Sequence, residues 1–128
     1  MKTVLITGAK GFIGRNLSAR LSAAADVRLV RYDMDSPAAD LDEGLATADV
    51  VFHLAGVNRP KDVEEYDSGN AGFTGEICQR LRKIKRKPKM VMTSSIQAEM
   101  DNPYGVSKRK AEESLVQYSR ETGAIVSI

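Results

Sequence analysis

Residues 3–14 read TVLITGAKGFIG, a short apolar run that leads into three glycines with the spacing G-x-x-G-x-x-G. The β-branched and leucine side chains of residues 3–7 are typical of a short buried strand. Downstream of the strand, large apolar residues recur at four-residue intervals, which predicts one apolar face of a helix over residues 11–24. The residues on this face are Ile13, Leu17 and Leu21.

The three glycines have separate mechanical roles in a strand–turn–helix unit. Gly8 permits a tight turn, Gly11 lets the backbone approach a pyrophosphate, and Gly14 lets the helix pack closely on the strand. The helix N-terminus then offers free N–H groups and a positive dipole end to phosphates. Asp33 follows at the end of the next apolar run, close to the spacing expected for a carboxylate that binds ribose. The pattern predicts a dinucleotide site; the alternative is a purely structural glycine turn.

The choice of nucleotide stays open from these residues. A carboxylate at Asp33 would accept a hydrogen bond from a ribose 2′-hydroxyl and repel a 2′-phosphate, which favours NAD(H). Arg15 and Arg31 are nearby in the sequence and could hold a 2′-phosphate, which would favour NADP(H). Alternatively, Asp33 only caps a loop.

Apolar runs and amphipathic segments alternate along the rest of the chain. This alternation predicts an α/β fold, a Rossmann-type doubly wound parallel sheet in one NAD(P)-binding domain over residues 1–128. The last strand reaches the final residue, so we expect the fold to be truncated at its C-terminus. Further strands are expected at 27–32, 50–54, 89–93 and 124–128, and further helices at 36–46, 69–85 and 103–122, with Ser36 and Asn102 as N-caps before prolines.

The composition is that of an ordinary globular chain, with 42% hydrophobic and 28% charged residues among 128. The net charge of +2 is too small to imply a polyanionic partner, and the seven basic residues within 80–89 are expected to face water rather than nucleic acid. Apolar runs are too short for a membrane span or a signal peptide, which predicts a cytoplasmic protein without a membrane partner. Cys78, the only cysteine, is expected to be half-buried in the core, His53 is expected to pack at the end of its strand, and no metal site is expected.

A second cluster of polar residues follows the strand expected at 89–93. Tyr104 and Lys108 form a Y-x-x-x-K pattern whose four-residue spacing places both on one face of a helix. A phenol has a pKa of about 10, and a nearby ammonium lowers it toward the range of a useful proton donor. Ser94 and Ser95 lie at the carboxyl edge of the sheet, where a hydroxyl could donate to a substrate carbonyl. Such a set suits general acid–base catalysis of hydride transfer.

These motifs together resemble the extended short-chain dehydrogenase/reductases, the NAD-dependent epimerase/dehydratase family, over essentially the whole chain. Residues 7–14 are similar to the family's T-G-x-x-G-x-x-G, and residues 49–56 to its D-x-V-x-H-x-A-[AG]. The resemblance implies that Ser95, rather than Ser94, is the catalytic serine and that Asn70 supports the active-site lysine through water. The implied catalytic residues are Ser95, Tyr104, Lys108 and Asn70, and the implied cofactor contacts are Gly8, Lys10, Gly11, Phe12, Ile13, Gly14, Arg15, Arg31, Asp33, Leu54, Ala55, Gly56, Tyr104 and Lys108.

Residues 53–60 and 94–105 further resemble the CapF-type capsular polysaccharide enzymes. That resemblance implies NADP(H)-dependent reduction of a 4-keto UDP-deoxy-amino sugar for capsule or O-antigen precursors, and a C-terminal cupin domain absent from these residues. Ser95-Ile96 stands where dehydratases of the family carry an acid pair, so dehydration is not expected. A UDP-sugar 4-epimerase and a non-catalytic NAD(P)-binding redox sensor remain as alternatives.

The chain departs from the family in two spacings. Only 15 residues separate Asp33 from Asp49, so a strand that most members have there is expected to be missing or vestigial. The gap from Ser95 to Tyr104 is also short, as in CapF-like sequences. Because the family's substrate-binding residues are absent, we expect little turnover of a UDP-sugar by these 128 residues alone. Members of the family commonly dimerise through two long helices, which correspond here to those expected at 69–85 and 103–122. The resemblance therefore implies a homodimer.

Overall fold

The computed structural model contains a parallel sheet with the strand order β2-β1-β3-β4-β5. It describes residues 1–33, 35–54, 71–93 and 103–128, without the side chains of residues 103 and 104. The short apolar runs form these strands because the three central ones, β1, β3 and β4, are buried between helical layers, whereas the edge strands β2 and β5 are only partly buried. The strands are β1 (Lys2–Thr7), β2 (Val27–Tyr32), β3 (Val50–His53), β4 (Lys89–Met92) and β5 (Val126–Ser127).

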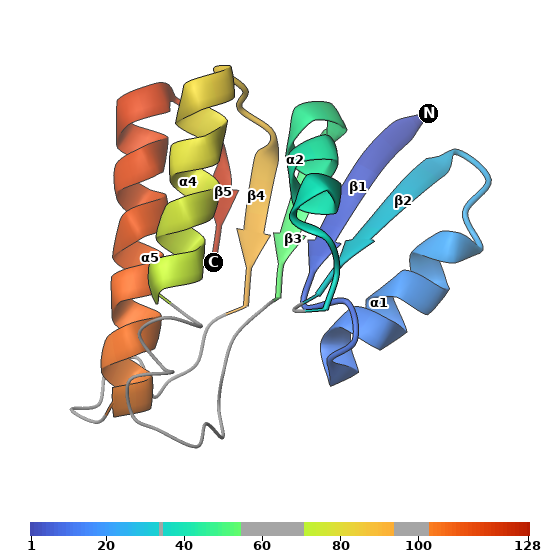
Figure 1. Ribbon diagram of the computed structural model, residues 1–128, viewed down its shortest axis with the longest axis horizontal. Helices are drawn as coiled ribbons and strands as arrows, with labels where there is room; N and C mark the ends of the chain where they lie inside the picture. The colour runs from blue at the N-terminus through green and yellow to red at the C-terminus, as the bar shows by residue number, and fades with distance from the viewer. Residues whose placement is uncertain (34, 55–70, 94–102) are drawn as a thin grey trace.

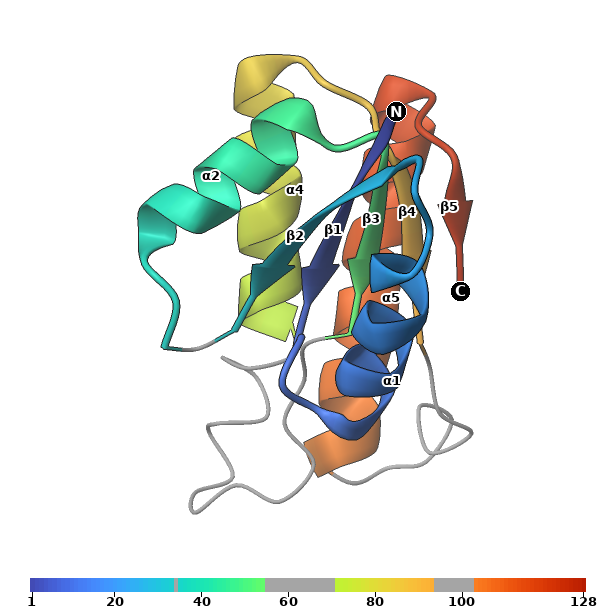
Figure 2. The ribbon, with the colours of Figure 1, turned by 90° about the vertical axis from the view of Figure 1, so that its right-hand side faces the viewer.

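Helices cover both faces of the sheet (Figures 1 and 2). The chain steps from β1 to β2 in one direction and then crosses β1 to place β3 on its other side. Right-handed crossovers therefore put the helix after β1 on one face and the later helices on the opposite face. The helices are α1 (Phe12–Ser22), α2 (Ala38–Thr47), α4 (Phe73–Ile84) and α5 (Pro103–Thr122).

The strand order reverses between β1 and β3, and in open α/β sheets the crevice that binds ligands lies at the carboxyl ends of the strands at such a reversal. The pairing is in register from Val4 with Val50 to Thr7 with His53. The glycine turn leaves β1 at this edge, and α5 begins near it (Figure 1). The predicted fold class, a doubly wound Rossmann-type sheet, is confirmed.

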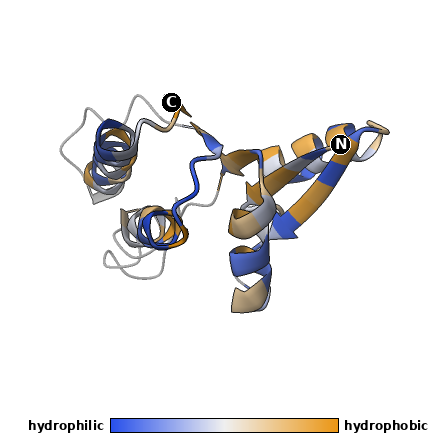
Figure 3. Cartoon of the chain, turned by 90° about the horizontal axis from the view of Figure 1, so that it is seen from above, coloured by the Kyte–Doolittle hydropathy of each residue, from blue (hydrophilic) through white to orange (hydrophobic). Residues whose placement is uncertain are grey.

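Two apolar clusters hold the layers together. The larger joins Leu5, Val51 and Met90 to α2, α4 and α5, and Leu115 and Tyr118 of α5 are fully buried in it. The smaller packs Val4 and Ile6 against α1 through Leu17 and Leu21, among others. Seen along the strands, α4 and α5 lie side by side at one end of the sheet, each with hydrophobic and hydrophilic sides (Figure 3).

Three local features can be compared with the sequence expectations. Helix α1 begins beyond the ends of the strands (Figure 1), and Ile13, in its first turn, is 52% exposed, whereas Leu17 and Leu21 of the same face pack on the sheet. Ser36 is not the N-cap of α2; Pro37 occupies that position, and the Ser36 hydroxyl accepts a hydrogen bond from the Asp33 N–H at 3.0 Å instead. The α-helix α4 extends from Phe73, residues 71–72 before it are π-helical, and the expected start at about residue 69 lies outside the described residues.

The described residues between β2 and β3 form α2 and its connections, with no additional strand. The sequence expectation that the strand usual in the family is missing here is confirmed for those residues. As a result β2 is an edge strand, and the crossover to β3 is short.

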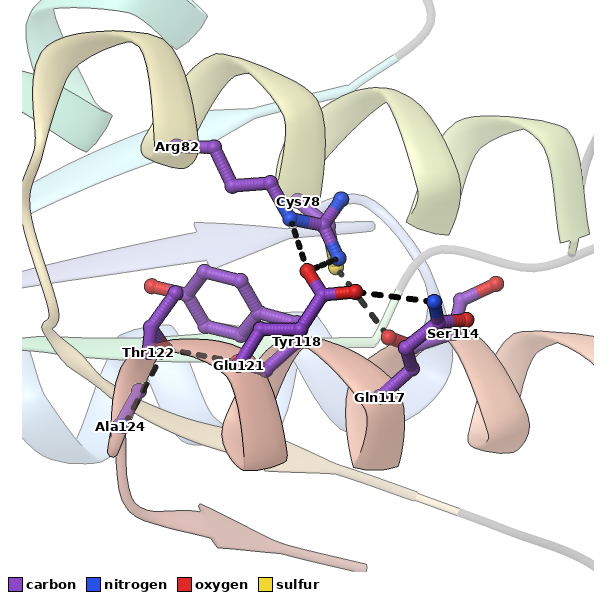
Figure 4. Close-up of polar contacts among 8 residues, drawn as sticks. All are labelled: Cys78, Arg82, Ser114, Gln117, Tyr118, Glu121, Thr122 and Ala124. Carbon is purple, nitrogen blue, oxygen red and sulfur yellow. Dashed lines mark hydrogen bonds and ion pairs between the residues drawn. The ribbon is translucent and has the colours of Figure 1, made fainter.

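Arginines of the basic segment at residues 80–89 form ion pairs and hydrogen bonds that connect α4 to neighbouring elements. Arg80 forms ion pairs with Glu76 and Asp42, and Arg82 forms one with Glu121 at 3.0 Å (Figure 4). The Arg86 guanidinium donates to the Leu45 carbonyl oxygen at 2.9 Å. None of the described helices is both long and apolar enough to cross a bilayer.

Candidate functional site

The glycine turn after β1 has the geometry that its sequence predicts. Gly8 has φ +71°, a left-handed conformation that side chains disfavour. A Cβ at Gly14 would lie 2.1 Å from the Gly8 carbonyl oxygen and 2.9 Å from the Ala9 Cα, so only glycine lets α1 pack this closely on the turn. The two residues together leave a cradle of bare backbone at the mouth of the crevice.

The N-terminus of α1 faces this cradle without a side-chain cap. Gly11 is the N-cap residue in an extended conformation, and no side chain bonds to the helix N–H groups there. Those N–H groups lack helical partners and carry the positive end of the helix dipole, which suits them to bind an anion. The adjacent side chains of Phe12 and Ile13 are 77% and 52% exposed, so they are available to contact a ligand.

Asp33 lies at the end of β2 and is tied to the glycine turn. Its carboxylate Oδ2 accepts a hydrogen bond from the Lys10 backbone N–H at 2.8 Å. The Lys10 ammonium forms an ion pair with Asp35, and this contact raises the pKa of Lys10. The Asp33 carboxylate thus stabilises the glycine turn through this hydrogen bond. Its other oxygen is where a ribose hydroxyl would be expected to bind.

The two arginines proposed for a 2′-phosphate lie in different places. The Arg31 guanidinium donates to the Ser22 hydroxyl at 2.8 Å, in the last turn of α1 and therefore at the end of that helix remote from the glycine turn. Arg15 is in the first turn of α1 and exposed. The structure brings Arg15 to the cradle, whereas Arg31 is directed away from it.

A buried chain of hydrogen bonds runs under the crevice. His53 accepts or donates through Nδ1 to the Thr7 hydroxyl and through Nε2 to the Thr74 hydroxyl, at 2.7 Å in each case. The ring is only 2% exposed and makes an edge contact with Phe73, the first residue of α4. Burial, together with the charge of Lys108, lowers the pKa of His53 to about 4, so the imidazole is neutral near pH 7.

Lys108 lies in α5 and is almost fully buried, with 8% of its surface exposed. Burial lowers the pKa of its ammonium, while the charge of Glu112 one turn later opposes that shift. Its influence on His53 places this charge near the carboxyl ends of the strands. Tyr104 lies one turn earlier in the same helix, which begins at Pro103 as expected, but its side chain is outside the described residues.

Of the remaining predicted site residues, the structure describes one and does not describe the others. The Leu54 N–H donates to the Thr7 carbonyl oxygen at 3.1 Å, which continues the β1–β3 pairing into the crevice. Ala55, Gly56, Asn70 and Ser95 lie outside the described residues. The predicted set as a whole therefore stays a prediction, and its described part is the glycine turn, Arg15, Arg31, Asp33, Leu54 and Lys108.

Sequence reasoning missed the partners of His53 and the ion pair of Lys10. His53 was expected to pack at the end of its strand, and it does. The threonine opposite it could have been found, since Thr7 and His53 occupy matched positions in two strands of the D-x-V-x-H and T-G-x-x-G motifs. The Asp35 contact has no comparable signal, because it depends on the shape of the turn at residues 33–36.

Comparison with known proteins agrees with this geometry. The model of the NAD dependent epimerase/dehydratase family matches residues 4–128, which is nearly the entire chain. The chain belongs to this family. Members bind NAD or NADP nucleotides, which accords with the uncapped helix and bare backbone of the glycine turn.

Individual members of the epimerase/dehydratase family are similar over the full chain. A UDP-2-acetamido-2,6-beta-L-arabino-hexul-4-ose reductase of Pseudomonas aeruginosa is 45% identical over 125 residues, covering 98% of this chain and 34% of the reductase. The capsular polysaccharide assembling protein CapF of Staphylococcus aureus superposes with a TM-score of 0.81 at 40% identity, covering 96% of this chain and 33% of CapF. RMD of Pseudomonas aeruginosa, solved with NADPH, has a TM-score of 0.77 at 25% identity, covering 98% of this chain and 52% of RMD.

The chain spans about a third of the length of the reductase and of CapF. The resemblance to CapF-type enzymes within the family is confirmed by these two relatives.

Proposed function

We propose that this chain supplies the cofactor-binding and proton-transfer parts of a reductase that acts on a 4-keto UDP-deoxy-amino sugar, in the synthesis of capsule or O-antigen precursors. The observation that carries the proposal is the 45% identity to a reductase of that type over 125 residues, 98% of this chain. The reaction is expected in the cytoplasm, where UDP-sugars are made.

The described residues fit a dinucleotide. The cradle at Gly8 and Gly14 has no room for a side chain, and the N-terminus of α1 is free of any side-chain cap. Both features suit a pyrophosphate, whose negative charge the helix dipole would stabilise. Asp33, at the end of β2, is positioned to meet the adenosine ribose.

When bound, the nicotinamide would supply the hydride that reduces the keto carbon. Tyr104 would give its phenolic proton to the carbonyl oxygen, so that the ketone becomes an alcohol. Lys108 would stabilise the resulting phenolate through its ammonium, and Ser95 would donate a hydrogen bond to the same carbonyl oxygen. Asn70 would support Lys108 through water, as in the family.

His53 contributes indirectly to this scheme. A neutral imidazole beside Lys108 adds no second positive charge to a buried region, where repulsion between like charges is strong. The Thr7–His53–Thr74 chain also fixes the end of β1, from which the glycine turn departs.

A UDP-sugar 4-epimerase is the second candidate, because the family includes epimerases that use the same kind of site. The two activities differ in their use of cofactor. A reductase consumes one NAD(P)H for each sugar converted, whereas an epimerase returns the hydride and leaves the nicotinamide unchanged overall.

The first test is a titration of the chain with NADPH and with NADH, followed by nicotinamide fluorescence. Binding of at least one nucleotide is expected, and a folded chain that binds neither would contradict the proposal. A redox sensor would bind equally well, so a second test must report on chemistry.

The second test is a chimera in which residues 1–128 replace the matching segment of the Pseudomonas aeruginosa reductase. With a 4-keto UDP-sugar, absorbance at 340 nm is expected to fall stoichiometrically with product. Tyr104→Phe should lower the rate by about 10²-fold or more, the usual contribution of a general acid, without loss of nucleotide binding. Product formed at constant 340 nm absorbance would instead support the epimerase, and full activity of the Phe variant would exclude the proton-transfer role.

A groove of about 530 Å³ runs between α4 and α5, lined in part by Gly75, Ser114 and Gln117. It lies on the two helices through which the family resemblance implies a homodimer. The homodimer stays a prediction, which sedimentation of the chain would test.

A further inference from the structure

Two carboxylates and one ammonium meet where β2 ends beside the glycine turn. The Lys10 N–H donates to Asp33 at 2.8 Å, while its side chain reaches on to Asp35. Lys10 therefore spans both acids, one through its backbone and the other through its side chain.

A turn at residues 33–36 holds Asp35 in this place. The Ser36 N–H donates to the Asp33 carbonyl oxygen at 2.9 Å, and the Asp33 N–H donates to the Ser36 hydroxyl at 3.0 Å. These reciprocal bonds fold the chain back toward the glycine turn. The contact of Asp35 with Lys10 is thus a product of a defined turn and not of a free loop.

The guanidinium of Arg31, also in β2, does not take part in this cluster. Arg31 donates to Ser22 at the far end of α1. Lys10 is a described cation close to both acids, since its pKa is raised by Asp35 first and also by Asp33.

Resting on the proposed function, we infer that Asp35 determines nucleotide specificity by withholding the Lys10 ammonium from a 2′-phosphate. With Lys10 paired to Asp35, the three described groups Asp33, Asp35 and Lys10 together carry a net negative charge, which suits the ribose hydroxyl of NAD(H) and opposes the phosphate of NADP(H). With Asp35 neutralised, Lys10 is free to bind the phosphate.

The exposure of the pair limits the size of the effect. The Lys10 and Asp35 side chains are 67% and 64% exposed, so water and salt screen their attraction. A dianionic phosphate competes well for such a lysine, because it carries twice the charge of a carboxylate and the existing ion pair is exposed and weak. Asp35 therefore sets a ratio of affinities and does not exclude either nucleotide.

The test compares Asp35→Asn with the unchanged chain in titrations with NADPH and NADH at low salt. The variant should bind NADPH about threefold to tenfold more tightly, as expected for release of one exposed ion pair, and NADH within about twofold. The double variant Lys10→Met with Asp35→Asn should lose this gain, since the released ammonium is then absent. High salt should diminish the difference.

Glu43→Gln is the matched control. It removes a carboxylate from another exposed ion pair, with Arg28 near the amino end of β2, and should leave the ratio of the two affinities unchanged.

Three outcomes would overturn the inference. They are an unchanged ratio in Asp35→Asn, an equal gain for both nucleotides, and a gain that persists when Lys10 is replaced, which would assign the phosphate contact to another cation such as Arg15. If the unchanged chain is folded by circular dichroism and binds neither nucleotide, the proposed function itself fails.

Discussion

The carboxyl edge of the sheet and the α4–α5 pair are built on opposite principles. At the edge, polar groups are buried and backbone atoms approach closely, as at His53 and at Gly14 against Gly8. In the helix pair, the buried side chains are mainly apolar, and charges such as those of Arg82 and Glu121 lie at the surface (Figure 4).

The difference teaches where the molecule tolerates change. At the edge each side chain has one geometry that works, because a buried hydrogen bond or a backbone contact leaves no alternative. On the surface of the helix pair water can replace a lost partner. We therefore expect substitutions at the edge to cost several times more than those in the helix pair, even when the chemical change is similar.

The largest contrast is expected from one methyl group added to two different glycines. Gly14→Ala places a Cβ 2.1 Å from the Gly8 carbonyl oxygen, a backbone atom that cannot move aside cheaply. It should lower the free energy of unfolding by about 3 kcal/mol or more, the upper range for overpacking. Urea denaturation would measure the change.

Gly75→Ala is the matched control in α4, since no atom lies within 4 Å of a Cβ built there. It should be neutral or stabilise by up to about 1 kcal/mol, because alanine favours a helix. Equal losses in the two variants would contradict the proposed contrast.

An effect of intermediate size on the free energy of unfolding is expected from His53, and this effect depends on pH. The folded state holds this imidazole neutral with a pKa of about 4, whereas the unfolded chain has a value near 6.5. Below pH 6.5 the unfolded state binds the proton more readily, so stability is lost as pH falls toward 4. The full loss is roughly 3 kcal/mol from this pKa difference.

His53→Leu separates this contribution from that of the carboxylates. The variant should cost about 1–3 kcal/mol at pH 7, because two buried hydroxyls lose a hydrogen bond, and it should lose less further stability between pH 6.5 and 4. Parallel pH profiles for the variant and the unchanged chain would refute the assignment of that slope to His53.

The smallest effect is expected on the surface of the helix pair. Glu121→Gln removes the charge from the ion pair with Arg82, whose side chains are 46% and 28% exposed respectively. The loss of stability should be at most about 0.5 kcal/mol and should vanish in 1 M salt. A loss as large as that of His53→Leu would show that the two regions do not differ as described.

The sequence predicted those features that local pattern determines. Strand and helix order followed from apolar periodicity, and Gly8 and Gly14 were placed correctly because a turn and a close approach each require glycine. Periodicity placed Ile13 on the apolar face of α1 but did not predict its 52% exposure, because periodicity does not report where a helix extends beyond its sheet. The direction of the Arg31 side chain could not be predicted, because a long side chain can reach several partners. Its partner Ser22 comes within reach only through the packing of α1 on β2.

At each end of the paired strands β1 and β3, a hydrogen bond joins two residues that are 46 positions apart in the sequence. The Thr3 N–H donates to the Asp49 carboxylate at 2.8 Å at one end, and Thr7 bonds to His53 at the other. These contacts close a segment that contains α1, β2 and α2, so their formation has a loop-closure cost. The edge is assembled only when residues far apart in the chain come together, so a nucleotide that binds there would stabilise the native state over the unfolded one.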